Sequence, residues 1–307
     1  MSRILVTGGS GFIGRHAVVA LEKAGHDVVL LSRSESSSPS GYDYVVGDLL
    51  KVGDPERIAK EAGADLLLHL AWETEHGHFW NAQSNHLWRE QTIKLVSAFW
   101  KEGGQRAVCA GTCAEYDWNN LSSSDDLDEY NSPENPATLY GQSKLDCFKA
   151  LTAKSDKRKS LAWGRVFLLY GAGETPTRFV PSIVCSLLSD KEAPMSSGTQ
   201  IRDFMDSRDV GRAFASLLLS SVEGAVNIAS GHGYRLLDVA KLIAQKLEKE
   251  ELLKPGTYPD RDNEPLCLVG AANRLKEEVG FQAEYTLEEG LSDCLKYWQS
   301  HLGRGSQ

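Results

Sequence analysis

The segment from Thr7 to Gly14, TGGSGFIG, constrains the fold of this 307-residue chain more than any other. It follows an aliphatic run at positions 3–7 and opens a helical pattern at positions 12–24. Glycines in this spacing permit a tight turn and a close approach of the backbone, and the helix that follows presents free N–H groups to a phosphate. The pattern therefore predicts a dinucleotide site whose pyrophosphate is bound by Gly8, Gly11, Phe12, Ile13 and Gly14.

Short apolar runs alternate with helical patterns through the first half of the chain, which is typical of right-handed βαβ units. The predicted strands are residues 3–7, 28–31, 44–46, 65–70, 107–110 and 161–167, and residues 225–228 return to the same sheet. These runs are apolar on both faces, as parallel strands covered by helices are. We expect an α/β fold, a doubly wound parallel sheet (Rossmann) with a smaller discontinuous C-terminal substrate lobe. The predicted ranges are 1–170 plus about 203–230 for the first domain, and 171–202 plus 231–300 for the lobe.

Charge and cysteine content exclude several classes of partner. A formal net charge of −9 argues against nucleic acid or an anionic membrane as the main partner. The apolar runs are far too short to cross a bilayer. The six cysteines are scattered and form no CxxC pair, so they indicate reduced thiols in a cytoplasmic protein rather than a disulfide framework or a metal site.

The end of the second predicted strand bears on the choice of dinucleotide. An acidic residue there would bind the ribose hydroxyls and repel a 2′-phosphate, but this chain has Ser32 and Arg33. A hydroxyl beside a guanidinium suits a 2′-phosphate, which favours NADP. Alternatively, Arg33 stacks on adenine and NAD is the cofactor. Asp48 and Leu49, after the third strand, are placed to contact the adenine.

Two residues on one helical face carry the candidate catalytic chemistry. Tyr140 and Lys144 are four residues apart. An ordinary tyrosine pKa near 10 is too high for proton exchange at neutral pH, and a neighbouring ammonium is expected to lower it. Thr112 follows the strand at 107–110, at the sheet edge where ligands of α/β proteins bind, and is placed to orient a reacting oxygen.

With these motifs in order, the chain resembles the extended short-chain dehydrogenase/reductase family, in its nucleotide-sugar epimerase, dehydratase and reductase branch. The residues that carry the resemblance are the Thr7–Gly14 turn, the Thr112 loop with Tyr116, the segment 136–144, Tyr170-Gly171 and the run 200–204 with Asp209-Val210. The resemblance implies a homodimer and a catalytic trio of Thr112, Tyr140 and Lys144, in which Tyr140 exchanges a proton while the nicotinamide exchanges hydride.

The resemblance also implies further binding residues. Arg202 and Arg261 are expected to contact the diphosphate of a nucleotide sugar, although each equally suits an ion pair with the aspartate beside it. Leu70, Ala71 and Phe167, at or just beyond strand ends, are expected to contact the cofactor together with Tyr140 and Lys144.

Departures from the family pattern narrow the expected reaction. Similar dehydratases carry an acid pair directly after the catalytic threonine, where this chain has Cys113 and Ala114. Glu115 beside Tyr116 resembles some 4-ketosugar reductases. We therefore predict an NADP(H)-dependent reductase of a nucleotide-activated 4-keto-6-deoxy sugar. The alternatives are a 4-epimerase that retains NAD and a non-catalytic protein that senses a dinucleotide.

Tryptophans recur at positions 72, 80 and 88, with histidines at 76, 78 and 86 between them. An aromatic stripe of this kind more often packs in a core or a dimer interface than binds a cofactor. The histidine spacing matches no standard metal site. We predict a loop and helix that form an aromatic wall on the sugar side of the cleft.

Overall fold

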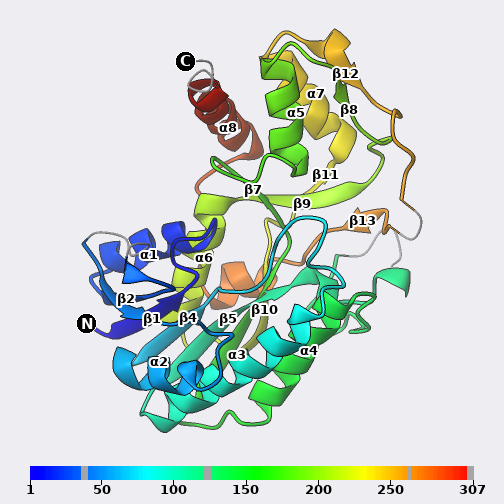
Figure 1. Cartoon of the computed structure of the whole chain (residues 1–307). Helices are drawn as coiled ribbons and strands as arrows, with labels where there is room; N and C mark the ends of the chain where they lie inside the picture. Colours follow the sequence, from blue (N-terminus) through cyan, green and yellow to red (C-terminus); the bar gives the residue numbers. More distant parts are fainter. Residues whose placement is uncertain (36–40, 121–125, 262–263, 303–307) are drawn as a thin grey trace.

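The computed structural model describes residues 1–35, 41–120, 126–261 and 264–302, and it shows a large parallel sheet beneath a smaller lobe (Figure 1). The seven strands are all parallel and run in the order β10-β6-β5-β4-β1-β2-β3. Their bounds are β1 Arg3–Thr7, β2 Asp27–Ser32, β3 Asp43–Val46, β4 Leu66–His69, β5 Arg106–Thr112, β6 Ser160–Val166 and β10 Gly224–Ile228. The predicted α/β class and doubly wound sheet are confirmed.

Helices cover both faces of this sheet. One face carries α1 (Gly14–Lys23) and α6 (Ser207–Leu219), and the other carries α2 (Asp54–Ala62), α3 (Ser84–Lys101) and α4 (Leu139–Thr152). Because side chains alternate along a strand, Ile4 and Val6 pack with α1 and α6 while Leu5 packs on the opposite side. Strand β1 is therefore apolar on both faces, as its sequence indicated.

The smaller lobe is built around a second sheet. In it β9 (Ile201–Asp206) pairs with β7 (Leu168–Tyr170), β11 (Gly233–Arg235) and β13 (Cys267–Leu268). A two-stranded pair, β8 (Ala193–Pro194) with β12 (Leu253–Lys254), and the helices α5 (Phe179–Leu188), α7 (Leu236–Lys246) and α8 (Leu287–Leu302) complete it. The predicted domain ranges remain a prediction; β7 and β9, which those ranges largely assigned to the first domain, pair in this second sheet.

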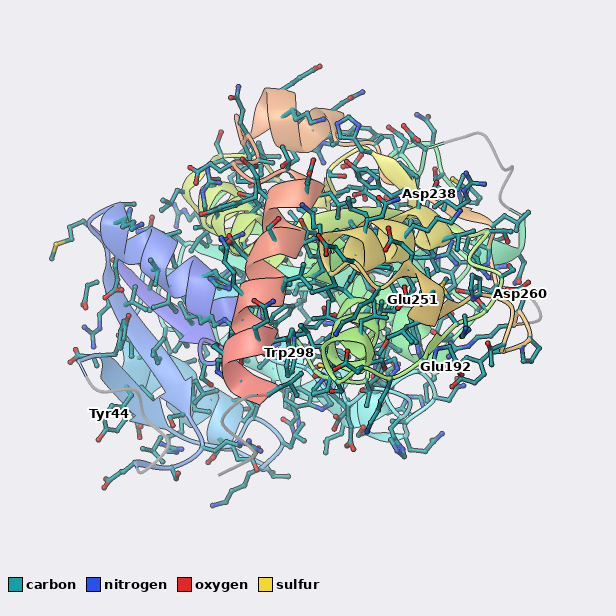
Figure 2. All side chains as sticks on the ribbon, turned by 90° about the horizontal axis from the view of Figure 1, so that it is seen from above. Tyr44, Glu192, Asp238, Glu251, Asp260 and Trp298 are labelled. Carbon is teal, nitrogen blue, oxygen red and sulfur yellow. The ribbon has the colours of Figure 1, made fainter. Side chains whose placement is uncertain are left out.

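Acidic side chains are spread over the smaller lobe, in keeping with the negative net charge. Seen from above, Glu192, Asp238, Glu251 and Asp260 lie on that lobe, and all four are exposed (Figure 2). Within the described ranges, no helix has both the length and the apolar character needed to cross a membrane.

Four short helical turns complete the described structure: η2 Cys113–Glu115, η3 Trp118–Asn120, η4 Glu250–Leu252 and the π-helical η5 Arg274–Glu278. Of these, η2 matters most for the site, because it follows β5 at the carboxyl edge of the large sheet. Thr112 caps it, accepting a hydrogen bond from the Ala114 amide at 3.2 Å.

Candidate active site

The turn between β1 and α1 requires its glycines. Gly8 has a φ of +70°, and a Cβ on Gly14 would lie 2.0 Å from the carbonyl oxygen of Gly8. The helix consequently begins at Gly14, two residues later than predicted, because residues 8–13 form the turn. The amides of its first turn lack helical carbonyl partners. This cradle fits the pyrophosphate of a dinucleotide, with Gly11, Phe12 and Ile13 as the residues to hold it.

A buried histidine ties the neighbouring strand ends together. His69 at the end of β4 is bonded through Nδ1 to the Thr7 hydroxyl (2.7 Å) and through Nε2 to the Thr92 hydroxyl (2.9 Å). Burial lowers the pKa of His69 to about 3, so the ring is neutral at physiological pH. The Thr7 hydroxyl also accepts from the Ala71 amide at 3.3 Å. Leu70 and Ala71 are thereby held against the glycine turn, where Ala71 is in contact range of Gly8.

The residues predicted to contact the adenosine lie at the same sheet edge. Ser32 ends β2, is buried, and donates from its hydroxyl to the Ser34 carbonyl at 2.8 Å, whereas Arg33 is exposed. Beyond β3, Asp48 is exposed and Leu49 is buried. Since β1, β2 and β3 are adjacent in the sheet, this edge brings the adenosine-side residues next to the glycine turn.

Tyr140, Lys144 and Thr112 meet where α4 crosses the end of β5. A Cβ on Gly141 would lie 2.2 Å from the Ala114 carbonyl oxygen, so the absence of a side chain lets α4 approach the Thr112 loop. Thr138 caps α4, accepting from the Gly141 amide at 3.1 Å. The Thr112 side chain lies close enough to the Tyr140 hydroxyl to oppose the rise that burial causes in the pKa of Tyr140. The predicted trio is therefore assembled in one place.

Lys144 is almost fully buried, 3% exposed, and its ammonium donates to the Ala110 carbonyl at 2.6 Å. Burial lowers the pKa of Lys144 to about 8. Burial also raises the pKa of Tyr140, opposite to the lowering predicted from its spacing to the lysine. The prediction was wrong for this arrangement because Tyr140 is enclosed by aromatic rings, which disfavour a phenolate.

Those rings come from the segment that follows β4. Phe79, Trp80 and Trp72 all contact the Tyr140 ring edge-on, with centroid distances of 4.9, 5.9 and 6.4 Å. The Trp80 carbonyl also accepts from the Tyr140 amide at 3.0 Å. The predicted aromatic wall thus lies directly against the candidate catalytic tyrosine. The sequence pattern does not single out Phe79, because this residue lies outside the tryptophan repeat.

Glu115 is committed to a buried network. Its Oε2 accepts from Arg165 Nε at 2.8 Å, and its Oε1 accepts from the Trp163 indole (2.8 Å) and the Thr112 amide (2.9 Å). Arg165 also bonds Glu134. Glu115 and Arg165 are 0% exposed. Burial raises the pKa of Glu115 and the guanidinium opposes that rise. This carboxylate positions the Thr112 loop rather than facing a substrate.

The two predicted diphosphate arginines differ sharply in their surroundings. Arg202 is 3% exposed and donates to Glu264 at 2.8 Å and to the Ile201 carbonyl at 2.8 Å. Its partner is thus Glu264 and not the adjacent Asp203, which instead accepts from Ser230 and Gly231. Arg261 is exposed.

Arg178, a cation that the sequence analysis missed, faces the site from the smaller lobe. It precedes α5, and its guanidinium lies 5.6 Å from the centre of the Phe79 ring. Burial and the charges of Arg178 and Arg261 lower the pKa of His76, so these three groups are close together. The sequence signal that could have predicted Arg178 is its position as a cationic residue directly before a helix of the smaller lobe.

Phe167 lies between β6 and β7 and is buried with Tyr116, Leu127 and Ala229. Its ring centroid is 6.4 Å from that of Tyr116, whose hydroxyl donates to Asn227 at 2.8 Å. These contacts account for its packing, and its predicted contact with the cofactor stays a prediction.

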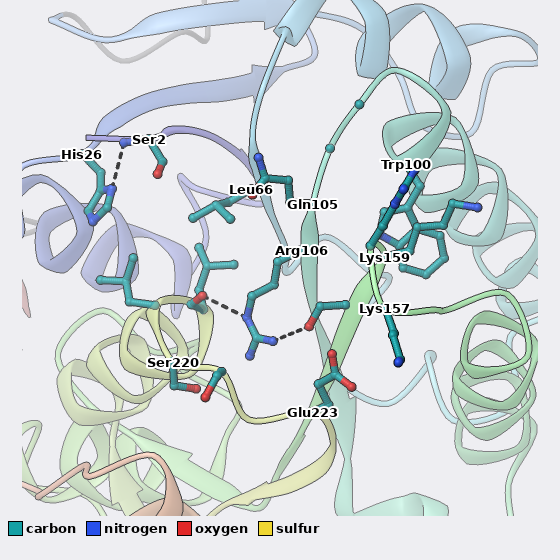
Figure 3. Close-up of a pocket in the computed structure, with 17 residues that line it drawn as sticks. Ser2, His26, Leu66, Trp100, Gln105, Arg106, Lys157, Lys159, Ser220 and Glu223 are labelled. Atoms are coloured by element: carbon teal, nitrogen blue, oxygen red, sulfur yellow. Dashed lines mark hydrogen bonds between the residues drawn. The ribbon is translucent and has the colours of Figure 1, made fainter.

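A cavity lies away from this site. It measures about 890 Å³ and is lined by the first residues of three strands, Leu66, Arg106 and Ser160 (Figure 3). It therefore opens at the amino edge of the sheet, opposite the glycine turn and Thr112. There Arg106 donates to the Leu218 carbonyl (3.0 Å), which holds α6 against the sheet, and to the Ser160 hydroxyl (2.6 Å) on the adjacent strand β6. Across the described residues, no group of three or more His, Cys, Asp and Glu side chains is arranged to hold a metal ion.

Residues 4–229 match the model of the NAD dependent epimerase/dehydratase family. The chain belongs to this family. It is accordingly an enzyme, and the sequence-based resemblance to the extended short-chain dehydrogenase/reductases is confirmed.

The relatives of the chain are nucleotide-sugar enzymes. It is 24% identical to a UDP-glucose 4-epimerase of Corynebacterium glutamicum, covering 92% of each chain. It is 26% identical to a dTDP-6-deoxy-L-talose 4-dehydrogenase (NAD(+)) of Aggregatibacter actinomycetemcomitans, covering 87% of this chain and 99% of that one. The solved UDP-glucose 4-epimerase of Thermotoga maritima shares the fold, with a TM-score of 0.85 at 20% identity over 97% of this chain and 99% of that one.

Proposed function

We propose that this enzyme uses NADPH to reduce the keto group of a nucleotide-activated 4-keto-6-deoxy sugar, with Tyr140 as the proton donor. One contrast carries the proposal. The Tyr140 hydroxyl meets Thr112 beside the aromatic wall, whereas both oxygens of the nearest carboxylate, Glu115, are occupied by Arg165, Trp163 and the Thr112 amide. One proton-exchanging group suits ketone reduction.

The same contrast argues against a dehydratase. Elimination of water needs an acid for the leaving hydroxyl and a base for the carbon-bound proton. At the two positions after Thr112 this chain has Cys113 and Ala114. Burial raises the pKa of the Cys113 thiol to about 12, so it is a poor base at neutral pH.

Each residue has a defined task in the proposed reaction. The amides of the glycine turn hold the pyrophosphate, and Lys144 presents an ammonium beside Tyr140. When bound, the dinucleotide supplies the hydride. Thr112 orients the keto oxygen, and Tyr140 delivers the proton to that oxygen as it gains charge.

The aromatic wall favours a deoxysugar as the substrate, and it favours binding of that sugar in a single orientation. Trp72, Phe79 and Trp80 offer apolar surface against which a methyl group loses no hydrogen bond, whereas a hydroxymethyl group would. A 4-epimerase must let the ketosugar present both faces to the nicotinamide, and the three rings packed against Tyr140 restrict that turn. The Aggregatibacter relative acts on a 6-deoxysugar at C4, which also favours this reaction.

The anionic part of the substrate is proposed to bind Arg261 together with Arg178 and His76. Arg202 is buried and already paired with Glu264 and backbone carbonyls, so it is not part of this proposed anion site. The preference for NADP over NAD rests on Arg33, which is exposed at the end of β2 and free to reach a 2′-phosphate.

The 4-epimerase is the second candidate, because relatives of that activity match at similar identity. One experiment separates the candidates. The purified enzyme is mixed with NADPH or NADH and a dTDP- or UDP-linked 4-keto-6-deoxy sugar, and cofactor oxidation is followed at 340 nm. We expect one NADPH consumed per ketosugar. In a parallel assay with NAD and a UDP-linked 4-hydroxy sugar, interconversion of the 4-epimers without net change in NADH would establish the epimerase. Dinucleotide binding without either reaction would establish a sensor.

A further inference from the structure

The buried ammonium of Lys144 lies on the face of an indole. Its Nζ is 3.8 Å from the centre of the Trp72 ring, within cation–π range, and 2.6 Å from the Ala110 carbonyl oxygen. The Tyr140 and Trp163 rings are farther, at 5.9 and 6.0 Å. Trp72 is itself 9% exposed, so both partners are shielded from water. A cation–π contact gains strength when it is desolvated.

Trp72 is held in this position by a side chain from α3. The indole Nε1 donates to Asn85 Oδ1 at 2.8 Å, and Asn85 in turn donates to the carbonyls of Phe79 (2.7 Å) and Ala82 (2.9 Å). Asn85 is 0% exposed. The Trp88 ring stacks on Trp72, with the two ring centroids 6.0 Å apart. The orientation of Trp72 is therefore fixed by hydrogen bonding as well as by packing.

The ionisable groups around Lys144 supply little negative charge. On its own helix are Tyr140 and Cys147, and burial raises the pKa of both. Cys109 on β5 is likewise buried with its pKa raised to about 12, and His69 on β4 is neutral. Glu115 on η2 is bonded to Arg165. The ammonium thus depends on the Ala110 carbonyl and the indole face for stabilisation.

We propose that Trp72 is a positioning residue that keeps Lys144 protonated and aimed beside Tyr140 through its indole face, with Asn85 locking the ring. This role rests on the proposed function only in so far as Lys144 serves the reaction. A bulky aromatic directly after the Leu70-Ala71 pair is then a functional residue of this site and not merely core packing.

The test measures the ionisation of Lys144 directly. The full chain is labelled with ¹³C-lysine, and the Lys144 side-chain resonance, assigned by its loss in Lys144→Met, is titrated by NMR before coenzyme or substrate is added. Trp72→Leu keeps apolar bulk but removes the π face. We expect it to lower the pKa of Lys144 by about 0.5 to 1.5 pH units. Trp72→Phe retains a π face and should restore most of that difference.

Trp88→Leu is the matched control, because it deletes a tryptophan from the same cluster that stacks on Trp72 and not on the ammonium. An unchanged Lys144 pKa in Trp72→Leu would overturn the proposal. Equal shifts in Trp72→Leu and Trp88→Leu, or in Trp72→Leu and Trp72→Phe, would also overturn it, since packing alone would then explain them. Thermal melts show that each variant is folded. An enzyme inactive on ketosugars would still give this titration, so failure of the proposed function remains distinguishable.

Discussion

Two buried sets of ionisable side chains lie side by side in this enzyme and differ in how completely they are satisfied. Glu115 and Arg165 are fully buried, and three donors converge on the two oxygens of the carboxylate. Tyr140 and Lys144 are nearly as buried, yet the lysine has one carbonyl partner and an indole face, and the tyrosine hydroxyl has the Thr112 side chain near it.

Under the proposed function, the difference separates a structural pair from a reactive one. The Glu115 carboxylate, whose two oxygens are both bonded, is held in one state, because any proton movement would leave a donor unpaired; Arg165 Nη1 itself makes no hydrogen bond. A buried group with few partners keeps a perturbed pKa and capacity for a substrate oxygen. The family match and the position at the carboxyl edge of the sheet agree with the second description for Tyr140 and Lys144.

The largest expected effect comes from the reactive set. Tyr140→Phe should lower kcat by about 10²- to 10⁴-fold, because the proton donor is lost while the ring packing remains. Steady-state kinetics and dinucleotide titration measure this, and binding should persist. Tyr170→Phe is the matched control: this buried tyrosine bonds only carbonyls of the smaller lobe, at 3.3 and 3.4 Å, and should keep normal turnover. Equal kcat for the two variants would remove Tyr140 from the mechanism.

Breaking the structural set should instead cost stability. Arg165→Met leaves Glu115 buried without its cation, and we expect the free energy of unfolding to fall by about 3–5 kcal/mol. Denaturant titration measures the loss. Adding Glu115→Gln should recover part of it, because the uncompensated charge is then gone. A loss below about 1 kcal/mol would mean that the Glu115–Arg165 pair does not anchor the Thr112 loop.

The pH dependence should sharpen the contrast further. Since burial lowers the pKa of Lys144 to about 8, kcat/KM should fall above pH 8, by up to about tenfold per unit. The free energy of unfolding should instead increase over the same pH range. The cost of burying the charged lysine is fully present below pH 8 and is relieved between pH 8 and its unfolded pKa of about 10.4.

Lys144→Met serves as the control for both readouts, because it has no proton to lose. Its free energy of unfolding should lack the rise between pH 8 and 10 seen in the unaltered enzyme. A wild-type rate that stays flat to pH 10 would contradict the assignment of the ionisation to Lys144.

The smallest effect is expected at the solvent end of the structural set. The Glu134 side chain is 26% exposed and bonds Arg165 and Lys149. Glu134→Gln should cost about 1 kcal/mol at pH 7. Because Arg165 and Lys149 lower the pKa of Glu134, although burial opposes this, its stabilisation is present above its ordinary pKa of 4.5 and is lost as the pH falls through the lowered value. Denaturation curves of the two proteins should converge in acid; a constant gap would argue against the ion pair.

The large sheet was predictable from sequence, whereas much of the smaller lobe was not. The longer strands of the large sheet have apolar residues on both faces, and the glycine turn marks the first crossover. In the smaller lobe, β8, β12 and β13 have two residues each, too short for any periodicity. The pairing of β7 with β9 joins segments thirty residues apart, and no local sequence pattern predicts it.

The candidate site likewise has features that the sequence predicted and features that it did not. The spacing of Tyr140 and Lys144 and the position of Thr112 at a strand end were enough to bring the trio together. The ionisation of Tyr140 was predicted wrongly, because it depends on the rings of Phe79 and Trp80 that enclose it. Arg178 was missed because its approach to the site depends on how α5 lies over the sheet.

The sequence by itself determined the parallel sheet, its dinucleotide turn and the helical face that carries the tyrosine and lysine, since each depends on backbone geometry over a few residues. Only the tertiary structure decided which group each buried charge contacts: Glu115 meets Arg165, Arg202 meets Glu264, and Lys144 meets Trp72. Those outcomes depend on groups from distant segments that share a water-free space, where each hydrogen bond and charge counts for far more than it does in solvent.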